Sequence, residues 1–240
     1  MGGIRSLKEF IVRELMYPDS CIENKTEGTV VIRFTTDNTG NVLTYRLAQS
    51  ISPACDAESV RIFKMIEWLP AYTLGVPHAD SGILEIEFNL KKYRRMVKTR
   101  GYSKHYYPYE PMDTSGVVYK FNELHTPPRP IFSNENISLP GFIAANLNYP
   151  EAAIKQNIHG VVIIGFIVEP HGRISNVRVI ESLGAGCNEE TIRLVNLLKW
   201  MPGTYDHLAV RTRMTLSITF SLDPESGGMF NSKIKSSYGG

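Results

Sequence analysis

Apolar and polar residues alternate along four stretches of the chain, and a period of two is typical of strands that bury one face. Two of the stretches lie in the first half of the sequence and two in the second. Their apolar positions are Val30, Ile32, Phe34, Leu84, Ile86, Phe88 and Leu90, and then Val162, Ile164, Phe166, Met214, Leu216, Ile218, Phe220 and Leu222. A further strand is predicted after each glycine turn, over residues 42–49 and 174–181, so each half should contain a hairpin and a later strand.

A different spacing, of three and four residues, follows each hairpin and predicts an amphipathic helix. The apolar stripe comprises Ile62, Met65, Ile66 and Leu69 in the first half and Leu194, Leu197, Leu198 and Met201 in the second. Asp56 and Asn188 are suitable N-caps for these helices. Shorter helices are predicted over residues 6–16 and 139–148. A Tyr-Pro pair ends each one, because proline disfavours helical geometry in the residue before it.

The two halves are copies of one unit. A shift of 132 residues places Gly28 on Gly160 and needs no gap from Phe10 to Leu90. The coincident residues include Tyr17-Pro18, Gly40, Ser50, Cys55, Trp68, Pro70 and Phe88 with their counterparts Tyr149-Pro150, Gly172, Ser182, Cys187, Trp200, Pro202 and Phe220. We therefore predict an α+β fold of two tandem two-layer α/β sandwiches, each an antiparallel three-stranded sheet covered by a helix.

The repeat sets the expected domain boundaries. The first domain spans residues 1–92 and the second spans residues 139–223. Residues 93–138 are expected to be a linker that is first basic and aromatic and then Pro-rich, with a strand-like stretch at residues 117–121. Residues 224–240, rich in Gly, Ser and Lys, are expected to be a disordered tail.

Composition narrows the classes of partner. The net charge of +2 and the pI near 8.3 are too mild to predict a membrane or nucleic-acid partner, and no nucleic acid is expected. No run of about 18 apolar residues is present, so we expect no membrane span. Residues 1–16 have the pattern of an amphipathic helix rather than of a signal peptide, and we expect no signal or anchor in this chain.

One stretch departs from the even charge distribution. Seven basic residues between Lys91 and Lys104 precede any acidic residue, and tyrosines are interleaved with them. Basic residues among aromatics bind nucleic acid, anionic lipid or acidic glycan in other proteins, whereas a solvated linker has the same composition. The sequence leaves the role of residues 91–104 open between these alternatives.

No residues with the composition of a catalytic, cofactor or metal site recur in both copies. Ser50 recurs, but no His or acidic residue recurs beside it, none of the six histidines recurs, and no Cys and His residues have zinc spacing. Glu58 and Arg61 recur as Glu190 and Arg193 and suit an ion pair on a helix surface. We therefore expect no enzymatic activity, no cofactor and no metal.

The cysteines and tryptophans have structural explanations with one alternative each. Cys55 and Cys187 suit small buried thiols, and a Cys21–Cys55 bridge is the alternative in an oxidising compartment. Trp68 and Trp200 suit core positions, and the alternative is that they line a peptide groove.

The ordered set of recurring residues resembles the TonB C-terminal domain family. The first copy carries Tyr17-Pro18, Gly28-Thr-Val-Val-Ile-Arg-Phe34, the Gly40 turn, Ser50, Asp56, Trp68-Leu-Pro70 and a last strand with Phe88. The second carries Tyr149-Pro-Glu-Ala-Ala153, Gly160-Val-Val-Ile-Ile-Gly-Phe166, Gly172-Arg-Ile174, Ser182, Trp200-Met-Pro202 and Leu216-Ser-Ile-Thr-Phe220. The residues before each Tyr-Pro pair are similar to those of Bacteroidetes-type envelope proteins. Together the two copies cover about two thirds of the chain.

The resemblance implies a periplasmic or cell-envelope protein that supports energy-coupled outer-membrane transport. It implies that an extended peptide of an outer-membrane transporter, or another envelope protein, is captured as an added strand, which physically needs only an open sheet edge and side-chain pockets. The alternative is an envelope scaffold that self-associates through its sheet edges without energy transduction.

The outward residues of the last strand in each copy are the candidate binding residues. They are Arg211, Arg213, Thr215, Ser217, Thr219 and Ser221 in the second copy and Glu85, Glu87 and Asn89 in the first. The short polar residues of the second copy do not obstruct pairing, so we predict the stronger edge there. The acidic residues of the first copy predict a weaker edge, or one selective for basic peptides.

Overall fold

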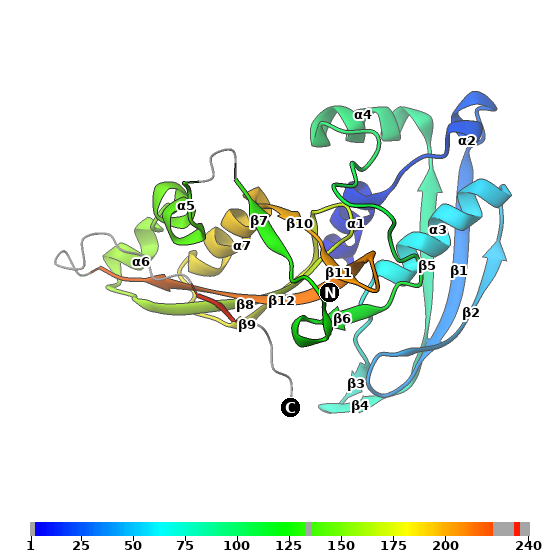
Figure 1. Cartoon of the computed structure of the whole chain (residues 1–240). Helices are drawn as coiled ribbons and strands as arrows, with labels where there is room; N and C mark the ends of the chain where they lie inside the picture. The colour runs from blue at the N-terminus through cyan, green and yellow to red at the C-terminus, as the bar shows by residue number, and fades with distance from the viewer. Residues whose placement is uncertain (1–2, 133–135, 223–232, 236–240) are drawn as a thin grey trace. The chain divides into compact units, whose positions relative to one another are not determined.

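The computed structural model describes residues 3–132, 136–222 and 233–235. The chain divides into two compact units, residues 1–105 and residues 106–240, each of which contains one copy of the repeat (Figure 1). Each unit is described by itself. Among the described residues, no helix has the length and apolar character that crossing a membrane requires.

The first unit is a two-layer α+β sandwich built on a three-stranded sheet. Strands β1 (Gly28–Thr36), β2 (Val42–Gln49) and β5 (Asp80–Phe88) are antiparallel and lie in the order β2-β1-β5. Helix α3 (Pro53–Met65) packs on one face of this sheet (Figure 1). The remaining elements are α1 (Gly3–Glu14), α2 (Asp19–Glu23), the hairpin of β3 (Ala71–Thr73) and β4 (Val76–His78), and α4 (Leu90–Arg100).

The core of the first unit contains the alternating residues of the predicted strands. Val30, Ile32 and Phe34 of β1 are buried against α3 together with Leu84, Ile86 and Phe88 of β5. The Phe34 ring also packs on the partly buried Trp68, with ring centroids 4.2 Å apart. The parity predicted for these strands is therefore confirmed.

The second unit repeats this arrangement and extends its sheet. Strands β8 (Gly160–Val168), β9 (Ile174–Glu181) and β12 (Leu208–Phe220) repeat the three-stranded sheet, and β11 (Gly203–Tyr205), β6 (Val118–Lys120) and β13 (Lys233–Lys235) are added to β12. The helices are α5 (Leu139–Asn146), α6 (Glu151–Lys155) and α7 (Cys187–Leu197), with a 3-10 turn η1 (Phe121–Glu123). Strands β7 (Arg129–Ile131) and β10 (Lys199–Met201) form a separate two-stranded sheet.

The core of the second unit is the counterpart of the first. Val162, Ile164, Phe166, Met214, Leu216, Ile218 and Phe220 are buried with α7 residues Leu194 and Val195. Trp200 is only 1% exposed and packs against Phe166, with ring centroids 5.7 Å apart. The burial of this tryptophan favours the core explanation over the peptide-groove alternative.

The predicted α+β fold is confirmed, but some local predictions are wrong. Leu69 and Leu197 are 61% and 50% exposed. Helix α3 ends at Met65, where the chain becomes extended, so Leu69 is no longer on the helical stripe. The N-caps are Ser52 and Gly186, so that Asp56 and Asn188 lie inside the first turn of their helices.

The residues expected to be a linker contain regular structure. Helix α4 belongs to the first unit, where its Tyr93 is buried and donates a hydrogen bond to the Ser103 carbonyl at 2.8 Å. Strand β6, inside the strand-like stretch at residues 117–121, and β7 belong to the second unit. The expected disordered tail lies outside the described residues, apart from β13.

Truncation of a strand phenylalanine tests the assigned core. Phe166→Ala is expected to lower the free energy of unfolding by about 3–5 kcal/mol, because a fully buried ring is replaced by a cavity. Leu69→Ala, at an exposed apolar position, is the control and is expected to change stability by about 0.5 kcal/mol or less. Urea denaturation of the full chain measures both. Equal losses in the two variants would contradict the core assignment.

Candidate functional site

The predicted binding edge of the second copy is already paired. Arg211, Arg213, Thr215, Ser217 and Thr219 lie on β12, and Ser221 directly follows it. One side of β12 pairs with β8 along residues 212–220. The other side pairs with β6 in parallel at residues 211–213 and with β13 at residues 215–217. Strand β11 pairs with residues 208–210, before the stretch that pairs with β8. Strands of the same chain therefore occupy this edge for most of its length.

Arg211 is not an outward edge residue. Its guanidinium holds both carboxylate oxygens of Glu169 at 2.9 Å and donates to the Gly116 carbonyl at 3.0 Å. The Ser175 hydroxyl donates to the same carboxylate. Arg211 and Glu169 are 4% and 1% exposed, so the pair is a buried, bidentate charge-assisted contact. It was missed because it depends on strand register: Glu169 follows β8 directly opposite Arg211.

The last strand of the first copy has one unpaired side. Strand β5 pairs with β1 along its whole length, and no other strand in the described part of the chain pairs with β5. Glu85 and Glu87 are exposed, as their alternation predicts, and Lys92 of α4 holds Glu87 in an ion pair at 2.6 Å. Asn89 instead caps α4, since its side chain accepts from the Lys92 N–H at 2.9 Å.

The opposite edge of the same sheet is β2, and it is apolar. Strand β2 also pairs only with β1 among the described residues. Its side chains Leu43, Tyr45 and Leu47 are 62%, 44% and 39% exposed. Exposed apolar residues on an unpaired strand favour association with another chain.

A glutamate and an arginine of the long helix clamp the end of the first helix in both copies. In the first unit, the Glu58 carboxylate accepts from the Met16 N–H at 2.7 Å, and Arg61 donates to the Glu14 carbonyl at 2.6 Å. The helix-surface ion pair predicted between the two side chains is present, at 2.7 Å. Its further role in holding two helices together could not be read from an i,i+3 spacing.

The second unit repeats the clamp atom for atom. Glu190 accepts from the Asn148 N–H and Arg193 donates to the Asn146 carbonyl, both at 2.6 Å. Burial disfavours ionisation of the Glu190 carboxyl, but the Arg193 and Asn148 hydrogen bonds outweigh it and hold its pKa below the usual 4.5.

Two glycines recur because the tryptophan segment passes directly over them. A Cβ on Gly40 would lie 2.4 Å from the Trp68 carbonyl oxygen, and a Cβ on Gly172 would lie 2.3 Å from that of Trp200. Both glycines also have positive φ angles, of 91° and 73°. The hairpin turn and the end of the long helix are therefore fixed to one another in each copy.

The recurring serine and the cysteines have local partners. The Ser50 hydroxyl donates to the Asp56 carboxylate, which braces the loop before α3. Cys21 and Cys55 are buried free thiols with their Sγ atoms 2.9 Å apart. Burial raises the pKa of the Cys55 thiol to about 12, so Cys55 is a protonated thiol at neutral pH.

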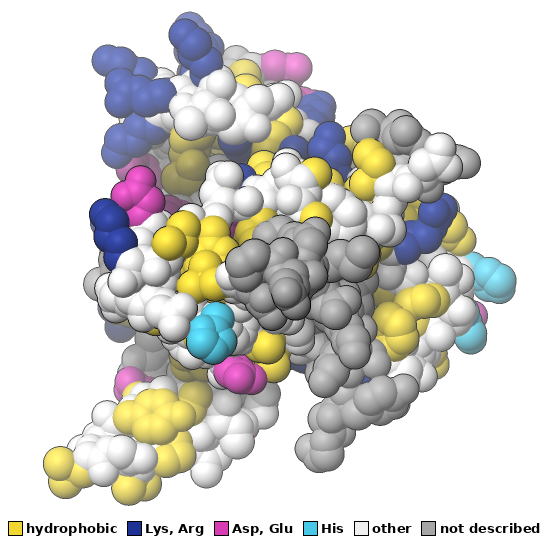
Figure 2. Space-filling model, turned by 90° about the vertical axis from the view of Figure 1, so that its left-hand side faces the viewer, with side chains coloured by type: hydrophobic (Ala, Val, Ile, Leu, Met, Phe, Trp, Pro, Cys, Tyr) yellow, Lys and Arg dark blue, Asp and Glu magenta, His cyan; other side chains and the backbone are white. Residues whose placement is uncertain are grey.

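Helix α4 divides its basic residues between two roles. Arg100 donates to the carbonyls of Val12 and Tyr102, and Lys104 beyond the helix pairs with Asp19 at 2.6 Å. Lys91, Arg94, Arg95 and Lys98 are exposed. Lys and Arg side chains, drawn in dark blue, gather at the top of Figure 2, at the height of α4 in Figure 1.

Comparison with known protein families shows which family this chain belongs to. The model of the family described as Gram-negative bacterial TonB protein C-terminal matches residues 13–90 and again residues 145–222. This chain belongs to the TonB C-terminal family. A comparison with curated proteins found no match.

Membership in the TonB C-terminal family gives the chain a broad role. It is a TonB-like, envelope-associated protein of the Gram-negative type, involved in the energy coupling of transport, with domains that bind other proteins rather than catalyse reactions. The two matches confirm the predicted tandem pair of TonB C-terminal domains.

The clamp predicts a pH-dependent stability. Glu190→Gln is expected to lower the free energy of unfolding by about 1–3 kcal/mol at neutral pH, because a charged acceptor of three hydrogen bonds is lost. Since the folded-state pKa is depressed, this contribution is complete above the unfolded value of 4.5 and disappears as the pH falls through the lower folded value. Glu189→Gln, the exposed neighbour, is the control. Urea denaturation across pH measures the difference, and a deficit that persists at low pH would contradict the clamp.

Proposed function

We propose that this protein acts in the periplasm and captures an extended peptide of an outer-membrane transporter, or of another envelope protein, as an added strand on β5 of the first unit. The observation that carries the proposal is a difference between the two copies: no described strand pairs with one side of β5, whereas the corresponding side of β12 is occupied by β6 and β13. An extended peptide gains backbone hydrogen bonds along β5 without displacing any strand of the chain.

Charge on β5 selects the peptide. Glu85 and Glu87 project from the strand into solvent, so a bound strand with Lys or Arg opposite them gains favourable cross-strand pairs. Lys92 already neutralises part of the Glu87 charge, which leaves Glu85 as the stronger determinant. The expected ligand is therefore a basic, extended segment.

The edge residues of β12 have a second, conditional role in this proposal. Capture at Thr215, Ser217 and Thr219 requires β13 to leave residues 215–217, and capture at Arg211 and Arg213 requires β6 to leave as well. The first copy thus acts as an open binding module and the second as an occupied one.

A scaffold function is the second candidate, and the exposed Leu43, Tyr45 and Leu47 on β2 favour it. Two copies of the chain that pair their β2 strands would cover these side chains and satisfy both edges. In that case the protein would self-associate without capturing a transporter peptide.

A peptide titration of the full chain tests the proposed function. The probe is a fluorescent peptide with Lys at alternate positions, and its affinity is measured by anisotropy. Glu85→Lys combined with Glu87→Lys should weaken binding about tenfold, because two favourable cross-strand pairs become repulsive. Glu181→Lys with Glu189→Lys makes the same charge change on exposed residues of the second unit and should have little effect.

Methylation of alternate peptide nitrogens should abolish binding, since it removes the backbone donors that a strand needs. Undiminished binding of the methylated peptide would contradict strand addition. Absence of peptide binding together with a dimer in sedimentation equilibrium would favour the scaffold function.

A further inference from the structure

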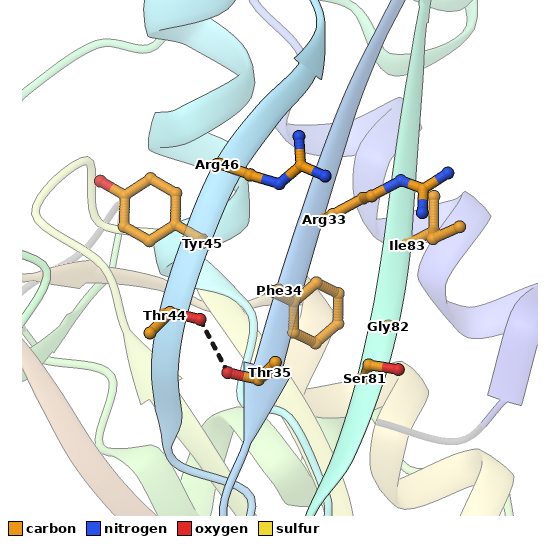
Figure 3. Close-up of a pocket in the computed structure, with 9 residues that line it drawn as sticks. All are labelled: Arg33, Phe34, Thr35, Thr44, Tyr45, Arg46, Ser81, Gly82 and Ile83. Carbon is orange, nitrogen blue, oxygen red and sulfur yellow. Dashed lines mark hydrogen bonds between the residues drawn. The ribbon is translucent and has the colours of Figure 1, made fainter.

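The sheet of the first unit carries a pocket on its face that extends across all three strands. The pocket measures about 330 Å³ and is lined by three consecutive residues from each of the three strands (Figure 3). Strand register arranges these residues in rows across the sheet. Arg33 of β1 lies opposite Arg46 of β2 and Ile83 of β5.

The neighbouring row on the same face consists of hydroxyls. Thr35 lies opposite Thr44 on one side and Ser81 on the other. The Thr35 and Thr44 hydroxyls share a hydrogen bond of 2.8 Å, drawn in Figure 3. Two residues along a strand span roughly 7 Å, so an ion of a few ångströms fits between the arginine row and the hydroxyl row.

The two arginines are cross-strand neighbours and have no acidic partner among the described residues. Both are exposed, and no described carboxylate lies within ion-pair distance of either guanidinium. Like charges directly opposite on neighbouring strands are destabilising, so an empty pocket costs stability that a bound anion restores. In Figure 3 both side chains extend across the sheet in the direction of β5, with the Arg33 guanidinium beside Ile83.

The layer beneath the pocket is firmly packed. The intervening row, Tyr45, Phe34 and Gly82, faces the opposite side of the sheet. The Phe34 ring fills the space of a side chain at residue 82, where a Cβ would lie 2.3 Å from the ring. The ring also packs against Phe63, at 5.2 Å between centroids. The strands that present the two rows are thereby fixed in register.

We propose that this pocket binds a phosphate group. A guanidinium presents two parallel N–H donors that match the oxygens of a phosphate, and two guanidiniums balance the charge of a dianion. Ser81 supplies one hydroxyl donor for the remaining oxygens, which a tetrahedral oxyanion has and a flat carboxylate lacks. The Thr35–Thr44 pair supplies a second, because only one of its two hydroxyls donates to the other. The phosphate belongs either to a soluble phosphate ester or to a lipid headgroup.

The second copy lacks this site. Gly165 replaces Arg33, and the side chain of its cross-strand neighbour Arg178 lies over it, with Nε 3.3 Å from the position of a Cβ. Ile167 and Arg213 stand where the first copy has Thr35 and Ser81. The pocket is therefore specific to the first unit. It shares β5 with the proposed peptide edge, but it lies on the face of the sheet and not along the backbone side of β5 that faces away from β1.

Titration of the full chain with inorganic phosphate at constant ionic strength tests the proposal. Two-dimensional ¹H–¹⁵N spectra should show saturable shifts at residues 33–35, 44–46 and 81–83. Arg33→Gln with Arg46→Gln should weaken phosphate binding at least about tenfold. The charge-matched control, Arg94→Gln with Arg95→Gln on α4, should leave it unchanged. Glu85→Gln should strengthen binding, because Glu85 is the next acidic residue along this face and repels the anion.

Vesicle sedimentation distinguishes the two sources of phosphate. Retention on phosphatidylglycerol vesicles that Arg33→Gln with Arg46→Gln abolishes assigns the phosphate to a lipid headgroup. A response to free phosphate without vesicle retention assigns it to a soluble ester. The proposal is overturned if phosphate shifts map to α4, if both double variants weaken binding equally, or if no saturable shift appears.

Discussion

The unsatisfied backbone of a strand edge is the constraint on which the rest of this protein depends. A three-stranded sheet leaves two rows of N–H and C=O groups without partners, and these groups either recruit a strand or must be covered. The second copy covers one edge with β6 and β13. In the first copy, described strands pair with β2 and β5 on one side only. The same sequence pattern has thus produced one occupied module and one open module.

The contacts that recur in both copies keep the helices and the sheet in the same arrangement, whereas the sheet edges of the two copies differ. The Glu-Arg clamp fixes the first helix to the long helix in each copy. A tyrosine of each Tyr-Pro pair donates to a backbone carbonyl, Tyr17 to Thr26 and Tyr149 to Ile158. None of these contacts touches the sheet edges. Changes at β5, β12 or the arginine row can therefore alter binding without loss of the fold.

Local periodicity explains why the strands and helices could be predicted from the sequence. Phe34, Phe88, Phe166 and Phe220 are buried. Their burial follows from a period of two, which is expected in any strand whose sheet is covered on one face, whatever element covers it. The coverage of β12 could not be predicted in this way, because β6 lies about ninety residues before its partner and pairs through its backbone. The Arg211–Glu169 and Arg33–Arg46 pairs depend on register, which the pattern of one strand does not reveal. Periodicity places Leu69 on the apolar stripe of α3, because it does not mark where a helix ends, and α3 ends at Met65.

Hydrogen–deuterium exchange of the full chain tests most directly whether the two copies differ in edge occupancy. In the free protein, the β5 amides that point away from β1 should exchange rapidly, and the paired amides at residues 215–217 of β12 should exchange slowly. A basic extended peptide should slow the β5 amides at alternate positions and leave β12 unchanged. Rapid exchange at residues 215–217 with protection appearing on β12 instead of β5 would contradict the account.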